Sequence, residues 1–344
     1  MLRYLPVAAM IACAAPVFAE VPQVVTDIAP LHSITARVMQ GAGEPAVLLP
    51  PGADPHHYAM RPSEAQLLQD ADVVLSVGAG LTPWLEGVTE DLSPDAVEMI
   101  WAELPGVTLI EITGAHGEGE AHEHEDAHDA HADDHDDHHD DHADDTHDEE
   151  THDEHGHDDH DDEEGHDDHA GHGDHSDDPH VWLNPDNASV VARAIAVQLG
   201  EMDAENAALY MQNAEAFAAD MDALSAEFEG QLSGATGAHI VTHDAYAYFE
   251  TRFGQRSVGA VTDSHAAEPG AAHIREIQEL VAEHDVACVI VEPAYNPGLL
   301  AAVFEGRAYE IVVADPLGAE HEPGAGLYPA LLKDLGAALA RCTK

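Results

Sequence analysis

The chain has 344 residues, and its formal net charge at neutral pH is −57. This charge excludes phosphate backbones and anionic membrane surfaces as partners, because both would repel the chain, and it suits a protein that handles cations. Apolar residues make up 44% of the chain, which is enough to build sizeable cores. The length predicts about two domains.

The N-terminal segment has the pattern of an export signal. Arg3 supplies a positive charge, the short apolar run LPVAAMIACAAPV follows, and VFAE offers a cleavage site after Ala19. The apolar run is too short to span a bilayer. We therefore predict a signal peptide over residues 1–19 and a mature protein in the periplasm. A lipoprotein acylated at Cys13 is the alternative.

The first part of the mature chain alternates short apolar runs with helical patterns. We expect helices within 31–43 and 61–71, the second capped by Ser63, and strands within 23–30, 46–58, 72–80 and 107–113. Nearly continuous apolar strands that alternate with helices predict a parallel sheet covered on both faces.

A segment rich in histidine and acidic residues follows. Residues 116–178 contain 30 Asp or Glu and 18 His, but no Lys or Arg. This composition does not bury enough apolar surface to offset the entropy of ordering, so we predict no secondary structure for the loop 115–179.

The helical pattern resumes at Asn184, an expected cap, with Pro185 at the first helical position. A second pattern of about 29 residues ends near Leu232 and would be roughly 43 Å long, enough to join two lobes. Strand patterns then return within 238–244, 256–261, 286–293 and 309–318, around a helix at 271–285.

The predicted fold class is therefore α/β, with two lobes that each contain a parallel sheet flanked by helices. A long backbone helix joins them, and the expected ligand site is the cleft between them. The predicted boundaries are residues 20–183 for the first lobe with its loop, 184–235 for the helical linker and 236–344 for the second lobe.

Four polar residues lie near predicted strand or helix ends. His56, His243 and Asp315 follow apolar strands, and His180 precedes the long helical region. In open parallel sheets, ligands bind beyond the carboxyl ends of the strands. Three imidazoles and a carboxylate suit Zn²⁺, which takes four nitrogen, oxygen or sulfur ligands.

The joint pattern resembles a known family, the metal-binding solute-binding proteins of ABC transporters. The likeness runs from about Val21 to the C-terminus and is greatest to the zinc type, often called ZnuA. It is carried by the motifs LLPPGADPHHYAMRPSEAQLLQDADVV, DPHVWLNP, VTHDAYAYFE and VADPLG.

The resemblance implies that His56, His180 and His243 hold the metal. Manganese-binding relatives carry glutamate at the third position, whereas the softer donor His243 favours zinc. Some relatives take a fourth ligand from a glutamate just before the first histidine, where this chain has Pro55. We expect Asp315 as the fourth ligand, with water as the alternative.

Other polar residues near these motifs have expected supporting roles. Metal-bound imidazoles usually donate their second N–H to a partner. The candidates for that role are Tyr58, Asp244 and Tyr246, with ordinary packing as the alternative. We expect His57 to face solvent or to support the ligands, and Glu292 to form a structural hydrogen bond rather than to ligate.

The mature chain would contain two cysteines, Cys288 and Cys342. An even pair in an oxidising compartment indicates a disulfide, although two unrelated buried thiols are an alternative. The family resemblance implies the same pairing.

These patterns predict a monomeric receptor that captures Zn²⁺ outside the cytoplasmic membrane and delivers it to the permease of an ABC transporter. It would have no enzymatic activity and no nucleic-acid partner. A zinc hydrolase is one alternative, although the chain has neither an HExxH motif nor a nucleophile elbow. A periplasmic zinc buffer is the other.

The histidine-rich segment is expected to be a low-affinity zinc collector or sensor, because neutral imidazole binds zinc near neutral pH. The alternative is a solvated spacer. The candidate secondary ligands are His122, His124, His128, His131, His135, His138, His139, His142, His147, His152, His155, His157 and His160.

Overall fold

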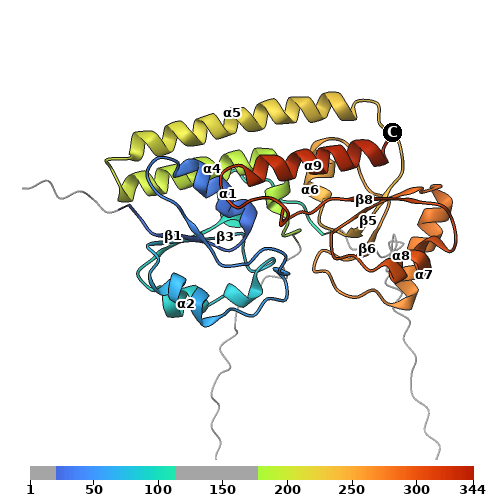
Figure 1. Ribbon diagram of the computed structural model, residues 1–344, viewed down its shortest axis with the longest axis horizontal. Coiled ribbons are helices and arrows are strands. Elements are labelled where there is room, and N and C mark those ends of the chain that lie inside the picture. The colour runs from blue at the N-terminus through green and yellow to red at the C-terminus, as the bar shows by residue number, and fades with distance from the viewer. Residues whose placement is uncertain (1–20, 113–176) are drawn as a thin grey trace, which may run out of the picture. The chain divides into compact units, whose positions relative to one another are not determined.

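The computed structural model describes residues 21–112 and 177–344 (Figure 1). The predicted signal peptide and the predicted secondary zinc ligands, His122 to His160, lie outside the described residues. Among the helices of the described part, none is both long and apolar enough to cross a membrane.

The first lobe is built around a parallel sheet with strand order β2-β1-β3-β4. Its strands are β1 (Val24–Thr26), β2 (Ala46–Val47), β3 (Val73–Ser76) and β4 (Val97–Ile100). Alternate residues of β1 and β3 pack on opposite faces, and both faces are buried. This double burial explains why these strands are almost continuously apolar.

Helices cover both faces of this sheet. One face packs against α1 (Ala29–Val38) and α4 (Pro185–Met202). The other face contacts α2 (Pro62–Gln69), the 3₁₀-helix η1 (Pro83–Leu85) and α3 (Val88–Leu92). A further short turn, η2 (Trp101–Glu103), follows β4.

The second lobe has a parallel sheet with strand order β6-β5-β7-β8. Its strands are β5 (Ile240–His243), β6 (Ala260–Thr262), β7 (Cys288–Val291) and β8 (Glu310–Val313). The helices α7 (Ala271–Glu283) and α8 (Pro297–Phe304) pack on one face, and α6 (Ala247–Arg252) and α9 (Leu327–Cys342) pack on the other. The prediction of two α/β lobes with parallel sheets is confirmed.

A long helix connects the two lobes, as predicted. The helix α5 (Ala207–Leu232) has 26 residues and lies along α4 at one end and along α9 at the other (Figure 1). Its buried residues, among them Phe217, Met221 and Phe228, belong to one hydrophobic core that includes residues of both sheets. This shared core links the two lobes.

The two cysteines form the predicted disulfide. Cys288, the first residue of β7, is bonded to Cys342, the last residue of α9, with the two Cα atoms 5.3 Å apart. The bond ties the C-terminal helix to the middle of the second sheet. In the chain-entropy treatment, closing a loop of this length stabilises the fold by about 4 kcal/mol.

Two local predictions are wrong. The run 107–113 does not join the sheet, because its backbone is satisfied elsewhere: Thr108 N donates to Asn187 Oδ1 and Ile110 N donates to Tyr248 Oη. The fourth strand is β4 instead. Ser63 does not cap α2, because Pro62 already occupies the first turn and Glu64 accepts a hydrogen bond from Arg61 N.

A third correction concerns the end of the acidic segment. Asp178, predicted to lie in a loop without structure, is 4% exposed, and its backbone N donates to Ile110 O over 2.7 Å. Asp177 forms a β-bridge with Glu111. This difference places a carboxylate beside His180.

Candidate metal centre

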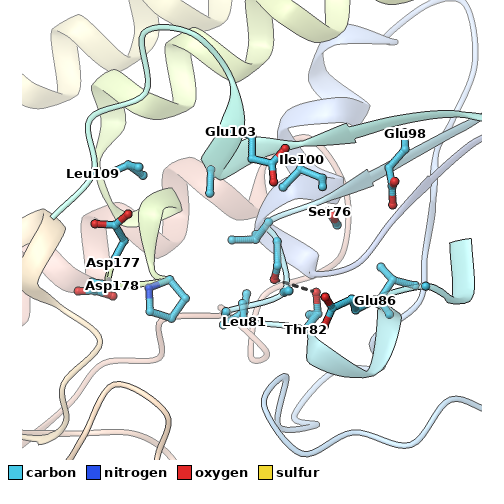
Figure 2. Close-up of a pocket in the computed structure, with 18 residues that line it drawn as sticks. Ser76, Leu81, Thr82, Glu86, Glu98, Ile100, Glu103, Leu109, Asp177 and Asp178 are labelled. Atoms are coloured by element: carbon cyan, nitrogen blue, oxygen red, sulfur yellow. Dashed lines mark hydrogen bonds between the residues drawn. The ribbon is translucent and has the colours of Figure 1, made fainter. Parts of the chain in front are cut away.

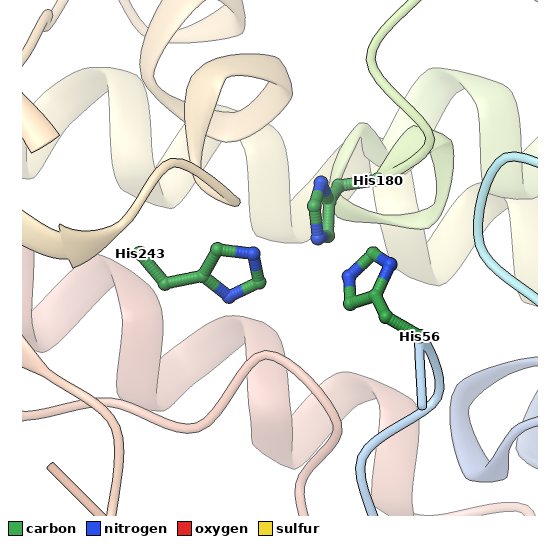
Figure 3. Close-up of side chains that lie close together, drawn as sticks. All are labelled: His56, His180 and His243. Carbon is green, nitrogen blue, oxygen red and sulfur yellow. The ribbon is translucent and has the colours of Figure 1, made fainter. Parts of the chain in front are cut away.

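Three histidines from separate parts of the chain meet where the two sheets end. His56 lies in the connection between β2 and α2, and His243 is the last residue of β5. His180 immediately precedes the 3₁₀-helix η3 (Val181–Leu183), which leads into α4. Figure 3 shows the three imidazole rings turned towards one another. The cavity that they line has a volume of about 280 Å³ and also contacts Glu292 and Asp315.

The spacing of the three rings is that of a metal site. One nitrogen from each histidine lies within 4.8 Å of those of the other two. The ring centroids are 5.6 Å apart for His56 and His180, 5.6 Å for His56 and His243, and 4.9 Å for His180 and His243. Two imidazoles on one tetrahedral zinc ion have centroids about 5 Å apart, given Zn–N bonds of about 2.0 Å.

All three side chains are removed from water. The exposed fractions of His56, His180 and His243 are 8%, 1% and 7%. Both ring nitrogens of His56 and the Nε2 atom of His180 are buried without a hydrogen-bond partner. Buried polar atoms are rarely left unpaired, so three such nitrogens at one place indicate a missing ligand.

Carboxylates orient two of the three rings. Asp178 Oδ1 lies 2.7 Å from His180 Nδ1, and Glu292 Oε1 lies 2.7 Å from His243 Nδ1. When Nδ1 carries the proton and donates it to a carboxylate, the lone pair of Nε2 is free to bind a metal. The predicted hydrogen-bonding role of Glu292 is thereby confirmed.

Burial and charge set different protonation states for the three rings. Burial and the neighbouring imidazoles lower the pKa of His56 to about 3, and they hold that of His180 well below its ordinary value. Burial also acts to lower the pKa of His243, but the hydrogen bond and the charge of Glu292 outweigh it and raise that pKa. His56 and His180 are therefore neutral near pH 7, as metal ligation requires.

A repeated triplet, Asp-Pro-His, forms the local structure around two of the histidines. Asp54 Oδ1 accepts a hydrogen bond from His56 N, and Asp178 Oδ1 accepts one from His180 N, each over 2.9 Å. An aspartate that binds the backbone two residues later forms an Asx turn. This repeat is the sequence signal that could have identified Asp178 as the partner of His180.

Hydrogen bonds between the lobes hold the segment around His180. Trp182 Nε1 donates to Pro316 O over 2.7 Å, and Tyr328 Oη donates to Trp182 O over 2.6 Å. Tyr248 Oη accepts from Ile110 N and donates to Asp178 O, both over 3.0 Å. The position of His180 thus depends on contacts with both lobes.

The remaining predicted residues lie nearby in other roles. Asp315 lines the cavity, but its two carboxylate oxygens accept hydrogen bonds from Leu317 N and Ala319 N. His57 faces solvent and lies 3.0 Å from Asp54 Oδ2.

The three residues predicted to orient the ligands make no hydrogen bond to them in the described part of the chain. Tyr58 Oη donates to Glu64, Tyr246 Oη donates to Ala314 O, and the backbone of Asp244 donates to Thr262 O. Asp178 and Glu292 perform that role instead, because they reach the rings from the neighbouring turn and strand end.

A second cavity, of about 340 Å³, is lined by residues of the first lobe, Asp178 among them (Figure 2). Its charged lining residues are Glu86, Glu98, Glu103, Asp177 and Asp178, and it includes no histidine. Carboxylate oxygens alone suit hard cations better than zinc. The cavity with the three histidines is therefore the candidate zinc centre.

Comparisons with known proteins agree with this geometry. The family described as zinc-uptake complex component A, periplasmic, or ZnuA, matches residues 24–342. The chain is 41% identical to the high-affinity zinc uptake system protein ZnuA of Paracoccus denitrificans, over 97% of this chain and 96% of that protein. It is 37% identical to the protein of the same name from Brucella abortus, over 96% and 94% of the two chains.

Solved structures share the fold. A crystal structure of ZnuA superposes with a TM-score of 0.67 at 19% identity and covers 94% of this chain and 99% of that one. The laminin-binding adhesin Lmb of Streptococcus agalactiae gives a TM-score of 0.66 at 19% identity, with coverage of 92% and 99%. From its match over residues 24–342, we conclude that the chain belongs to the ZnuA family of periplasmic zinc-uptake components.

Proposed function

We propose that this protein is a periplasmic zinc receptor that captures Zn²⁺ between its two lobes and delivers it to the permease of an ABC transporter. Membership of the zinc-uptake family supports this function, as do relatives named high-affinity zinc uptake proteins. Zinc is the cargo, and the chain is a transport receptor rather than an enzyme. The alternative of a zinc hydrolase is set aside, because the family is one of uptake components.

The observation that carries the proposal is the convergence of three buried imidazoles with unpartnered nitrogens. We propose that His56, His180 and His243 bind one zinc ion through one nitrogen each. Nitrogen donors at this spacing suit a tetrahedral zinc ion, and two of the rings are already oriented by carboxylates. The fourth ligand proposed from the sequence is Asp315 or water.

Metal titration by calorimetry tests this site. Full-length protein, a variant lacking residues 116–175, and that deletion combined with His243→Ala are titrated with Zn²⁺. We expect one tight site in the deletion variant and loss of most of its affinity after His243→Ala. His321→Ala is the matched control, because His321 is paired with Asp334 away from the cavity. Unchanged tight binding in the His243→Ala variant contradicts the assignment.

We also propose that the histidine-rich segment collects zinc at low affinity and passes it to the tight site. The composition of the segment predicts no structure of its own, so ordering it around metal would cost entropy, and each of its ions should bind more weakly than the ion at the three histidines. Deleting residues 116–175 should remove the weak zinc equivalents and slow loading when zinc is scarce. Unchanged stoichiometry indicates a spacer, and lost stoichiometry with unchanged loading indicates a buffer.

Three further features remain proposals. We propose cleavage after Ala19 to give a soluble protein, a monomeric state, and domain boundaries at 183/184 and 235/236. Mass spectrometry of the exported protein distinguishes cleavage at Ala19 from acylation at Cys13. Light scattering gives the oligomeric state, and limited proteolysis reports the boundaries.

A further inference from the structure

The three-histidine cluster lacks a fourth protein donor. Among residues 21–112 and 177–344, only His56, His180 and His243 bring ligand atoms within 4.8 Å of one another. Zinc sites are almost always four-coordinate. Both carboxylate oxygens of Asp315 already accept backbone hydrogen bonds, over 2.8 and 2.7 Å. The following inference rests on the proposed function and concerns the residue that completes this site.

A fourth imidazole stands at the edge of the cluster. His265 lies in the connection between β6 and α7, and its ring centroid is 6.0 Å from that of His56, with the ring planes at 61°. The rings within the cluster are 4.9 to 5.6 Å apart. With respect to His56 alone, a shift of about 1 Å would give the centroid spacing of about 5 Å that two imidazoles adopt on one zinc ion.

His265 is available for such a shift. Its side chain is exposed, and the hydrogen bond of its ring within the described residues is a long one, 3.5 Å from Ser264 Oγ to Nδ1. His57 provides a useful contrast. Its ring is 6.4 Å from that of His56, but it is paired with Asp54 over 3.0 Å. Ligation of zinc by His265 would therefore break only a long hydrogen bond, whereas ligation by His57 would break its shorter contact with Asp54.

The loop that carries His265 contacts a ligand nitrogen directly. Ser264 O lies 3.4 Å from His243 Nε2, the atom that the hydrogen bond to Glu292 leaves for zinc. An ion bound at that nitrogen replaces this contact and frees the carbonyl. Asp263 Oδ1 accepts hydrogen bonds from His265 N and Ala267 N, which tie the backbone of the turn together. Ala266, within it, has a φ of 58°, a strained conformation for a residue other than glycine.

We propose that His265, in place of the Asp315 or water expected from the sequence, is the fourth zinc ligand, an exchangeable one that the loop between β6 and α7 brings onto the ion. Arrival of zinc at His243 displaces Ser264 O and lets the turn swing its imidazole towards His56. His265 is exposed, whereas the other three ligands are buried.

Cobalt spectroscopy of full-length His265→Cys tests the contact directly. With one equivalent of Co²⁺, a thiolate ligand adds a sulfur-to-cobalt charge-transfer band to the visible bands of the tight site. The matched control is His57→Cys, which places a thiol at a similar distance from His56. We expect the band in the first variant and not in the second. Absence of the band in His265→Cys, or equal bands in both variants, overturns the proposal.

NMR spectra of the imidazole nitrogens test this proposal independently of the proposed function. On adding one equivalent of Zn²⁺ to the full-length protein, we expect the ring nitrogens of His56, His180, His243 and His265 to shift. Shifts of the first three without His265 overturn the fourth-ligand proposal and leave the zinc site in place. No shift of any of the four overturns both.

Affinity provides the last measurement. His265→Ala should weaken zinc binding by about tenfold, the lower end of what loss of a supporting group costs a metal site. His57→Ala should bind as the wild type does. Wild-type affinity in His265→Ala overturns the proposal, because a ligand to the ion cannot be removed without effect.

Discussion

Two copies of the same triplet, Asp-Pro-His, behave differently in this protein. In Asp54-Pro55-His56, one carboxylate oxygen binds the backbone of His56 and the other pairs with His57, so the ring of His56 has no partner. In Asp178-Pro179-His180, a single oxygen binds both the backbone and the ring of His180. The same triplet thus leaves the ring of His56 without a hydrogen bond but gives the ring of His180 a carboxylate partner.

The difference follows from burial. Asp54 is exposed, and a second histidine competes for its carboxylate. Asp178 is 4% exposed. Its backbone carbonyl accepts a hydrogen bond from Tyr248, and its carboxylate contacts the ring of His180. We infer that His180 is positioned before zinc arrives, whereas His56 is positioned by the ion itself.

The largest expected effect is that of removing either ring. His180→Ala and His56→Ala should each weaken zinc binding by more than about 100-fold, since about 3 kcal/mol is one ligand's share of a typical site. The two variants should differ in their free energy of unfolding. His180→Ala leaves a buried carboxylate oxygen without its ring partner and should lower the free energy of unfolding by about 1–3 kcal/mol.

Competition against a chelator and urea unfolding of the metal-free proteins measure the two effects. His56→Ala should unfold at nearly the wild-type urea concentration, because its ring has no partner to lose. Equal destabilisation by the two substitutions would show that His180 is not the more tightly held of the pair.

The next largest expected effect distinguishes Asp178 from Asp54. Asp178→Asn should weaken zinc binding by about 10- to 100-fold, because an amide supports the Nδ1–H of His180 less well than a carboxylate does. Asp54→Asn changes a group that has no contact with the ring of His56, so zinc affinity should stay within about threefold. Chelator competition at one pH compares them, and a larger loss in Asp54→Asn contradicts the contrast between the triplets.

Among the three imidazoles, the pH dependence of binding should come from His243 and not from the rings of the two triplets. The pKa values of His56 and His180 are lowered, so both rings are already neutral near pH 7. The pKa of His243 is raised above its ordinary value of 6.5, so zinc must displace a proton there. Affinity should therefore fall by about tenfold per pH unit below the pKa of His243.

Glu292→Gln sharpens this prediction. It removes the charge that raises the pKa of His243, so the fall in affinity should begin at a lower pH than in the wild type. Zinc titrations between pH 5 and 8, roughly the range in which histidine titrates, measure both curves. A steeper loss, of two protons, would show that a second group titrates as well; Asp178 is the first candidate, because burial raises its pKa to about 7.

A small effect on zinc binding is also expected of Tyr248→Phe. The change removes the hydroxyl that links Ile110 N and Asp178 O, and it should lower the free energy of unfolding by about 1–3 kcal/mol. The Asx turn that holds His180 stays intact, so zinc affinity should fall by less than about fivefold. Calorimetry of Tyr248→Phe and Asp178→Asn checks this. A loss of zinc affinity in Tyr248→Phe as large as that in Asp178→Asn would show that Tyr248 positions His180.

Much of the fold could be predicted from local patterns. Apolar runs such as those around Val74 and Ile290 are buried on both faces of a sheet, so their alternation with helices indicates the two parallel sheets. The prediction failed for 107–113, where the backbone pairs with Asn187 and Tyr248, residues about 80 and 140 positions away. A sequence pattern typical of a strand does not show whether the edge of a sheet lies close enough to pair with it.

The sequence by itself determined the two lobes, the connecting helix, the disulfide pair and the three candidate histidines, because each depends on a local pattern or a short motif. Only the tertiary structure decided which groups serve those histidines. Asp178 lies two residues from its ring, but only the structure shows that it holds this ring while Asp54 does not hold that of His56. Glu292 and His265 come from a strand end and an exposed turn, and their roles depend on a distance of a few ångströms to a ring elsewhere in the chain. Hydrogen bonding acts through space, so the order of residues along the chain does not specify these partners.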